Sequence, residues 1–204
     1  IPVTVDQLIP LTRAVVRGSK RAMVIADLPF GSYESSPDQA LATATRFFKE
    51  SGAMGVKLEG AHLASVEKLT AAGIPVMGHL GLTPQSLHQL GGYRVQGRTD
   101  GDAILDAALA LEKSGAFAIV LELVPAELAA RITAALTIPT IGIGAGRDCD
   151  AQVLVWTDMA GLTAHPPKLA KAYRNLRGEL LAATAEFAEE VRTGTFPTEK
   201  ETFH

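Results

Sequence analysis

The sequence predicts an α/β fold built around a parallel sheet, and three observations support this. Short apolar runs rich in β-formers alternate with longer helical stretches along the 204 residues. Most of these runs are apolar without strict alternation, as expected for parallel strands. Four helix-to-strand junctions also look alike, because SGAMGVKL, AAGIPVMG, SGAFAIVL and LTIPTIGI each join a helix stop to an apolar strand. We therefore expect repeated βα units.

Six segments have the composition of strands. In chain order they are Ala22–Leu28, Gly55–Glu59, Pro75–Leu80, Ala118–Leu123, Thr140–Ile143 and Val153–Thr157. A closed barrel needs eight βα units and typically about 250 residues, whereas an open doubly wound sheet needs five or six. The count of about six units therefore favours the open sheet slightly, and a barrel needs other support.

Helical segments fill the intervals between these strands. Ser36 and Pro37 begin one helix as its N-cap and first residue, and this helix stops at Gly52. The others run from Thr4 or Asp6 to about Arg17, over Ala61–Ala72, Thr83–Leu90, Asp102–Lys113 and Pro125–Leu136, and in a C-terminal pair over about Pro167–Leu176 and Glu179–Arg192. We see no linker, so we expect one domain over residues 1–204, with a peripheral tail over Thr193–His204.

The composition excludes several classes of protein. Basic and acidic residues nearly balance, at 19 and 22, and no basic stripe predicts binding to nucleic acid or to a membrane surface. The single cysteine, Cys149, excludes an internal disulfide and fits a reducing compartment. No apolar run approaches the roughly 20 residues of a membrane span, and no secretory signal is visible. We expect a cytoplasmic location.

Ionisable residues lie at or near the ends of four successive predicted strands. The first strand carries Asp27, the second Lys57 and Glu59, the third His79 and the fourth Glu122. In parallel α/β proteins the carboxyl ends of the strands form the active face. Buried charges are costly unless they are paired or bound to a metal, so four such strand ends in a row predict a shared site.

Each of these residues taken alone also has a structural interpretation. Asp27 precedes Leu-Pro and could cap a turn, while Lys57 and Glu59 face the same side of a strand and could form an ion pair. His79 lies between glycines, where a histidine is more often a hydrogen-bonded core residue than a catalyst. Glu122 lies in the apolar run IVLELVP, is hard to explain structurally, and is the favoured general base.

Asp27 and Glu59 together predict a site for a hard cation. Carboxylate oxygens are ligands that suit Mg²⁺. With one cysteine and no histidines at zinc-like spacing, a zinc site is disfavoured.

Two glycine-rich segments have weaker signals. Ile141–Gly146 resembles a phosphate-binding turn but lacks the G-x-G-x-x-G spacing, so a tight βα turn is the favoured interpretation. Gly91–Arg98 (GGYRVQGR) could be a mobile flap that meets an anionic or aromatic ligand, or a solvated surface loop.

Several longer motifs point to one family. They are ADLPFGSYE (Ala26–Glu34), VKLEG (Val56–Gly60), GHLGLTPQS (Gly78–Ser86), GGYRVQGR (Gly91–Arg98), LELVPAELA (Leu121–Ala129), and IGIGAG followed by QVLVWTDM (Gln152–Met159). In these segments the chain resembles the ketopantoate hydroxymethyltransferase family from end to end. The most specific signal is GHLGLTPQS with GGYRVQGR a few residues later.

The resemblance implies a (β/α)₈ barrel of the phosphoenolpyruvate/pyruvate-binding type, with about six βα units plus C-terminal helices here, assembled as a homodecamer. It implies transfer of a hydroxymethyl group from 5,10-methylenetetrahydrofolate to 3-methyl-2-oxobutanoate, which gives 2-dehydropantoate in pantothenate biosynthesis. By this resemblance Asp27 and Glu59 hold Mg²⁺, and Asp27, Lys57 and His79 bind the oxo-acid. Glu122 matches the catalytic base.

The sequence differs from the family pattern at its N-terminus. The family carries an upstream strand ending in Gly-Asp-Ser, which supplies another metal ligand, and the sequence begins at Ile1 beyond that point. We expect the native chain to hold further barrel units ahead of Ile1. Three alternatives stay open, namely an aldolase that forms a Schiff base on Lys57, a related Mg²⁺-dependent lyase, and a non-catalytic ligand-binding or assembly subunit.

Overall fold

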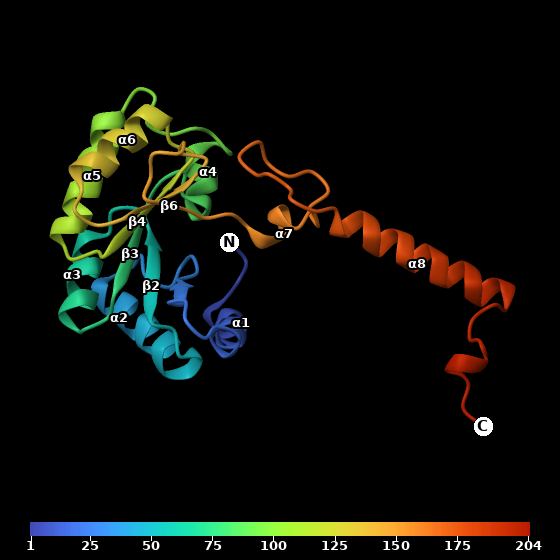
Figure 1. The fold of residues 1–204 in the computed structure, drawn as a ribbon. Coiled ribbons are helices and arrows are strands. Elements are labelled where there is room, and N and C mark those ends of the chain that lie inside the picture. Colours follow the sequence, from blue (N-terminus) through green and yellow to red (C-terminus); the bar gives the residue numbers. More distant parts are fainter. The chain divides into compact units, whose positions relative to one another are not determined.

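The computed structural model describes residues 1–204, which divide into two compact parts, residues 1–153 and residues 154–204 (Figure 1). The first part contains the sheet and most of the helices. The second contains the short helix α7 (Trp156–Met159), the longer helix α8 (Leu176–Thr193) and a 3₁₀ turn, η3 (Glu199–Glu201). No helix combines the length and the apolar composition required to cross a bilayer. The expectation of one domain over the whole chain stays a prediction.

Six parallel strands form one sheet in the order of the chain. They are β1 (Ile25–Asp27), β2 (Gly55–Glu59), β3 (Val76–Gly81), β4 (Ala118–Glu122), β5 (Thr140–Ile143) and β6 (Ala151–Gln152). A doubly wound sheet reverses its strand order at a switch point, whereas a (β/α) barrel does not. The sequential order therefore supports the barrel type over the open doubly wound sheet.

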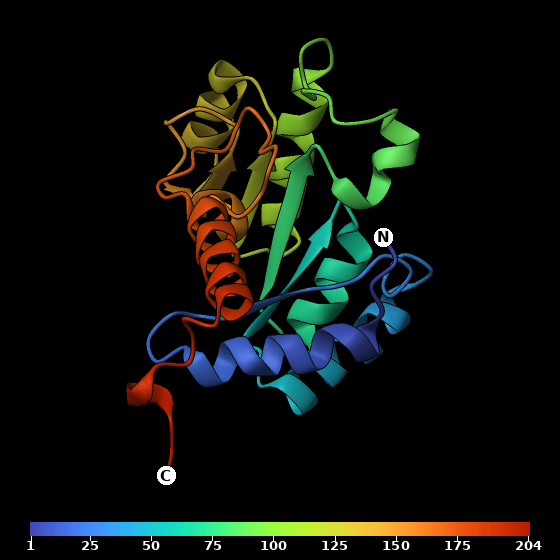
Figure 2. The ribbon, with the colours of Figure 1, turned by 90° about the vertical axis from the view of Figure 1, so that its right-hand side faces the viewer.

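Four helices of the first part cover one face of this sheet. On that side lie α2 (Pro37–Arg46), α3 (Leu63–Ala71), α5 (Gly101–Lys113) and α6 (Ala126–Ala135), as Figure 1 shows. The strand residues that point toward these helices, among them Val56, Leu58, Ile119 and Leu121, are fully buried. The other face is seen in Figure 2 in front of these helices, and one-sided covering is again the arrangement of a barrel. The predicted fold class is confirmed, with six parallel strands, although no helix lies between β5 and β6.

The helix starts follow the capping signals of the sequence. Thr4 accepts the Gln7 N–H in a capping box at the start of α1 (Val5–Gly18). Ser36 accepts the Gln39 N–H at 3.1 Å ahead of α2, with Pro37 in the first turn. The prediction continued α2 to a stop at Gly52, and the structure fills that interval with a single π-helical turn, η1 (Phe47–Ser51), before Gly52.

Two predictions near the C-terminus were wrong. The last strand was expected over Val153–Thr157, but β6 ends at Gln152, and Val153 donates a last bond of the ladder to Gly142 O before the chain turns into α7. A helix was expected over Pro167–Leu176, but this segment forms none. The Tyr173 and Leu176 N–H groups instead donate to Met159 O and Ala160 O at the end of α7. Apolar composition alone did not reveal these partners.

Gly81, the last residue of β3, is expected to tolerate no side chain. Its φ is +91°, and a Cβ there would lie 2.2 Å from the carbonyl oxygen of Glu122 and 2.6 Å from Val124 Cγ2. Gly73 has a similar φ of +82° but open space around it, so it serves as the matched control. Gly73→Ala should cost about 1–2 kcal/mol of unfolding free energy from backbone strain alone. Gly81→Ala should cost at least about 2 kcal/mol more, because it also adds an overpacked contact.

Urea unfolding of both variants measures this difference. Equal losses of stability in the two variants would contradict the close approach between β3 and the end of β4.

Candidate active site

The strand register places all five predicted site residues on the face of the sheet opposite α2, α3, α5 and α6. Asp27 pairs with Lys57 across β1 and β2, and Glu59 pairs with His79 across β2 and β3. Glu122 is in register with Gly81 at the end of β3. Paired residues of parallel strands point to the same side, and so do alternate residues of one strand. Four strand ends therefore deliver their ionisable groups to one place.

The five side chains form a continuous series of contacts. Lys57 Nζ lies 2.9 Å from Asp27 Oδ1 and 3.0 Å from His79 Nδ1. His79 Nε2 lies 3.2 Å from Glu122 Oε2. Glu59 Oε1 stands beside the middle of this series, 4.0 Å from Lys57 Nζ and 3.8 Å from His79 Nδ1. The structure thus brings the predicted residues together, and their individual roles stay predictions.

Burial differs along this series of contacts. Half of the Asp27 side chain is exposed, whereas only 5% of the Glu59 side chain and 3% of the His79 side chain are. Burial raises the pKa of Glu59 above its ordinary value of 4.5, although the hydrogen bond from the Gln85 N–H and the charge of Lys57 act in the opposite direction. The site therefore contains a carboxylate whose charge the chain compensates only in part.

The orientation of His79 is set by its two neighbours. The Lys57 ammonium has only protons to donate, so Nδ1 of His79 is the acceptor and Nε2 carries the ring proton when the ring is neutral. Nε2 lies at hydrogen-bond distance from Glu122, yet it is buried and the angle is too poor for a hydrogen bond. A small movement of the Glu122 side chain would align it as an acceptor for this N–H.

Two residues that the sequence analysis did not single out also belong to this site. Gln85, in the 3₁₀ turn η2 (Pro84–Ser86), donates its backbone N–H to Glu59 Oε2 at 2.8 Å. Tyr33, which is fully buried in the loop after β1, accepts the Glu59 backbone N–H at 3.2 Å. Both lie in segments that directly follow strand ends, and that position was the signal available for finding them.

The donor atoms fit a magnesium ion in type. Mg²⁺ commonly takes one or two carboxylates from a protein and completes its shell with water and substrate oxygens. Asp27 and Glu59 supply two carboxylates that both approach the cationic Lys57 Nζ, and the buried Glu59 would gain from a further positive charge. No three His, Cys, Asp or Glu side chains lie together as a metal-binding group.

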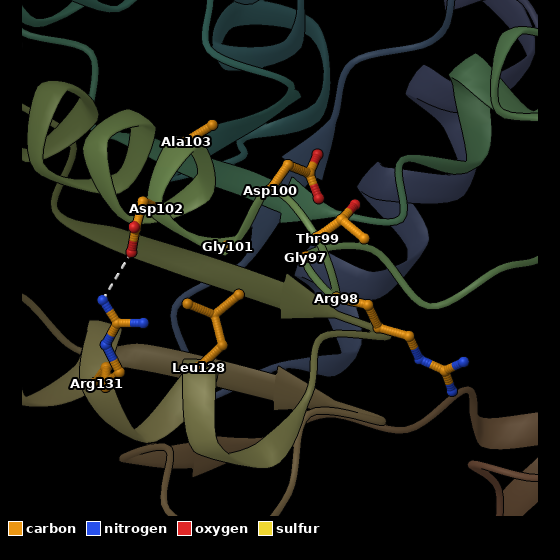
Figure 3. Close-up of a pocket in the computed structure, with 9 residues that line it drawn as sticks. All are labelled: Gly97, Arg98, Thr99, Asp100, Gly101, Asp102, Ala103, Leu128 and Arg131. Atoms are coloured by element: carbon orange, nitrogen blue, oxygen red, sulfur yellow. Dashed lines mark hydrogen bonds and ion pairs between the residues drawn. The ribbon is translucent and has the colours of Figure 1, made fainter.

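A separate hollow lies at the start of α5 (Figure 3). It has a volume of about 270 Å³ and includes Arg98, Leu128 and an ion pair between Arg131 and Asp102 with an N–O distance of 2.8 Å. Figure 3 shows the Arg98 side chain directed away from this ion pair. None of the five predicted residues lines the hollow, so it is not the candidate active site.

The two glycine-rich loops differ in how they are held. Gly146 has a φ of +82°, and a Cβ there would come within 2.6 Å of Ala126 Cβ, which supports the tight-turn interpretation of Ile141–Gly146. The Gly91–Arg98 segment is tied to the end of β4, because the Gln96 N–H donates to Leu123 O at 2.9 Å. Tyr93 in this segment is 72% exposed, and both interpretations of the loop stay open.

Comparison with known proteins decides the family. The family model described as ketopantoate hydroxymethyltransferase matches residues 1–199. The chain belongs to this family. Among curated 3-methyl-2-oxobutanoate hydroxymethyltransferases, one from Frankia alni (strain DSM 45986 / CECT 9034 / ACN14a) is 64% identical over 97% of this chain and 67% of its own length. One from Thermobifida fusca (strain YX) is 59% identical over the whole of this chain and 74% of its own length.

Solved structures outside the hydroxymethyltransferase family share the fold. A phosphoenolpyruvate phosphomutase from Streptomyces platensis subsp. rosaceus has a TM-score of 0.57 at 13% identity, over all of this chain and 73% of that one. A 2,3-dimethylmalate lyase, a member of the PEP mutase/isocitrate lyase superfamily, has a TM-score of 0.52 at 17% identity, over 99% of this chain and 72% of that one. These likenesses place the hydroxymethyltransferase chain in the predicted barrel class.

Glu59 gives this family member a pH-dependent stability that can be measured. A raised pKa in the folded state means that the folded protein binds more protons than the unfolded protein, so unfolding free energy falls as pH rises from about 4.5 through the folded pKa. Glu59→Gln removes this titration and keeps an oxygen for the Gln85 N–H. The stability of wild type relative to Glu59→Gln should therefore decrease with rising pH.

Urea unfolding between pH 4 and pH 8 in the presence of a chelator measures this difference. The matched control is Glu127→Gln on the exposed part of α6, which should show no such trend. A stability difference between wild type and Glu59→Gln that stays constant, or grows in favour of wild type with rising pH, would contradict the raised pKa of Glu59.

Proposed function

We propose that this chain transfers a hydroxymethyl group from 5,10-methylenetetrahydrofolate to 3-methyl-2-oxobutanoate and releases 2-dehydropantoate, a step of pantothenate biosynthesis. One observation carries the proposal. Four strand ends of a family member bring Asp27, Lys57, Glu59, His79 and Glu122 into one continuous series of contacts. The relatives named above carry the name of this activity.

The reaction needs a carbanion at C3 of the oxo-acid, and Glu122 is the proposed base. It lies at the end of β4, where the apolar strand residues before it are buried and its own side chain is 15% exposed. A carboxylate in that position can take the C3 proton and leave the electron pair of the C–H bond in an enolate. The enolate carbon then forms the new bond to the one-carbon unit carried by folate. The two bonds from this carbon to the folate nitrogens break, water supplies the hydroxyl oxygen, and tetrahydrofolate is released.

Lys57 and His79 are proposed to bind the oxo-acid beside Asp27. The Lys57 ammonium can offset the charge of the substrate carboxylate and of the enolate oxygen. The buried Nε2 of His79 lacks a well-aligned partner, so it can donate a hydrogen bond to an oxygen of the bound oxo-acid. Hydrogen-bond donors held in place in this way stabilise the negative charge that develops on the substrate during the reaction.

Asp27 and Glu59 are proposed to hold Mg²⁺. When bound, the ion would supply Lewis-acid polarisation of the 2-oxo group, an effect worth several kcal/mol. The observed distances support the pair, because both carboxylates already lie within 4.0 Å of one cationic group.

A Schiff base on Lys57 fits the geometry less well. A lysine that attacks carbonyl groups is usually freed of its proton by an apolar pocket or by a neighbouring cation. Lys57 instead lies beside an anion, in an ion pair with Asp27 at an N–O distance of 2.9 Å. Borohydride trapping with substrate should therefore leave the chain unlabelled, while a chelator should inhibit turnover.

Location in the cytoplasm and assembly into a homodecamer are further parts of the proposal. Both rest on the sequence signals and the family resemblance given above. Sedimentation analysis of the purified protein tests the assembly.

The transfer itself is tested by incubating the chain with both substrates and Mg²⁺ and detecting 2-dehydropantoate by mass spectrometry. Formation of this product supports the transferase over the related lyases. Cleavage products of the oxo-acid without any 2-dehydropantoate would favour a lyase instead.

The role of Glu122 is tested by Glu122→Gln. This variant keeps the shape of the side chain but cannot accept the C3 proton, so deuterium exchange at C3 of 3-methyl-2-oxobutanoate in D₂O should slow by about 10²–10⁴-fold. Proton NMR follows the exchange. Glu127→Gln, an exposed carboxylate on the following helix, is the matched control and should exchange at the wild-type rate. Wild-type exchange in Glu122→Gln would rule out this residue as the base.

A further inference from the structure

The Glu59 carboxylate presents its two oxygens to different surroundings. Oε2 accepts the backbone N–H of Gln85 at 2.8 Å. Oε1 faces the functional groups, with Lys57 Nζ at 4.0 Å and His79 Nδ1 at 3.8 Å. One oxygen is therefore occupied by the protein backbone, and the other is directed to the place where the proposed function puts a metal ion.

The backbone N–H that sets this orientation is itself held by the Gln85 side chain. Its Nε2 donates to the carbonyl oxygen of Leu28 at 2.9 Å, and its Oε1 accepts the Tyr33 hydroxyl proton at 2.7 Å. The Leu28 carbonyl can only accept and thus fixes which end of the amide is the donor. Both partners lie in the loop after β1, so the side chain joins the loop after β3 to the loop after β1.

Tyr33 completes a cyclic network of hydrogen bonds with Gln85 and Glu59. Its hydroxyl donates to Gln85 Oε1 and accepts the Glu59 backbone N–H at 3.2 Å. The ring of Tyr33 is fully buried and packs edge-on against His62, with 5.3 Å between ring centroids. Burial raises the pKa of Tyr33 above its ordinary value, so the hydroxyl keeps the proton that it donates.

We propose that Tyr33 and Gln85 are positioning residues that fix the Glu59 carboxylate for metal binding. Each of the three residues contacts the other two, so the carboxylate cannot rotate without breaking the Gln85 N–H contact. Neither Tyr33 nor Gln85 reaches the reacting atoms in this arrangement, and they act through Glu59. The inference rests on the proposed function, because it assumes that Glu59 is a metal ligand.

Partners of this kind orient a ligating group, and their loss typically lowers metal affinity by about 10–100-fold. Tyr33→Phe removes the hydroxyl and keeps the ring against His62. Gln85→Met keeps the length of the side chain, removes its polar atoms and leaves the backbone N–H in place. Each change breaks the cyclic hydrogen-bond network with little change in side-chain volume.

The test is a titration of the full chain with Mn²⁺, a probe for the magnesium site, followed by electron paramagnetic resonance of the free ion. We expect the dissociation constant to rise about 10–100-fold in each variant, with the number of sites per chain unchanged. In the double variant the dissociation constant should rise by less than the product of the two single increases, because both residues act through one shared network. Exposed matched controls are Tyr173→Phe and Gln89→Met, which should bind Mn²⁺ as wild type does.

The outcomes separate this inference from the proposed function. A lower number of sites with an unchanged dissociation constant would show a merely structural role and overturn the inference, as would wild-type binding in both variants. If wild type binds no Mn²⁺ at all, the metal assignment of Glu59 fails and the inference fails with it. The product assay for 2-dehydropantoate reports on the transfer reaction independently of this titration.

Discussion

The burial of the Glu59 carboxylate is the constraint on which the rest of the site depends. A buried charge is costly unless partners compensate it, and here these partners come from three directions. Lys57 precedes it by two residues on the same strand, His79 pairs with it on the next strand, and the Gln85 N–H reaches it from the loop beyond. Since Gln85 is in turn held by Tyr33, the burial of one carboxylate links the loops after β1, β2 and β3.

The parallel sheet explains why these partners can meet. Strands that run in one direction bring all their carboxyl ends to one edge, and a register of matched residues points their side chains to one side. Helices α2, α3, α5 and α6 cover the opposite face (Figures 1 and 2), so the ionisable side chains do not compete with these helices for space. A doubly wound sheet would cover both faces with helices and would leave a site only at its switch point.

Family membership and geometry answer different questions about this protein. The family follows from sequence similarity over almost the whole chain, whereas the solved structures of 13–17% identity speak only for the fold. The contacts between the five ionisable side chains add information on how these residues are arranged. Glu122 lies at one end of the contact series and Asp27 at the other, with the cationic Lys57 and the buried His79 between them.

The sequence by itself determined the strands β1 to β5, most helix starts and the five ionisable residues at the strand ends, because burial pattern, capping and strand-end position are local signals. It could not decide between an open sheet and a barrel, since strand order and the side covered by helices are set by packing between distant segments. It also placed a strand at Val153–Thr157 and a helix at Pro167–Leu176, where the structure has backbone hydrogen bonds to residues that composition does not reveal. Tyr33 and Gln85 lie 52 residues apart, and only the tertiary structure shows that they share a hydrogen bond beside Glu59.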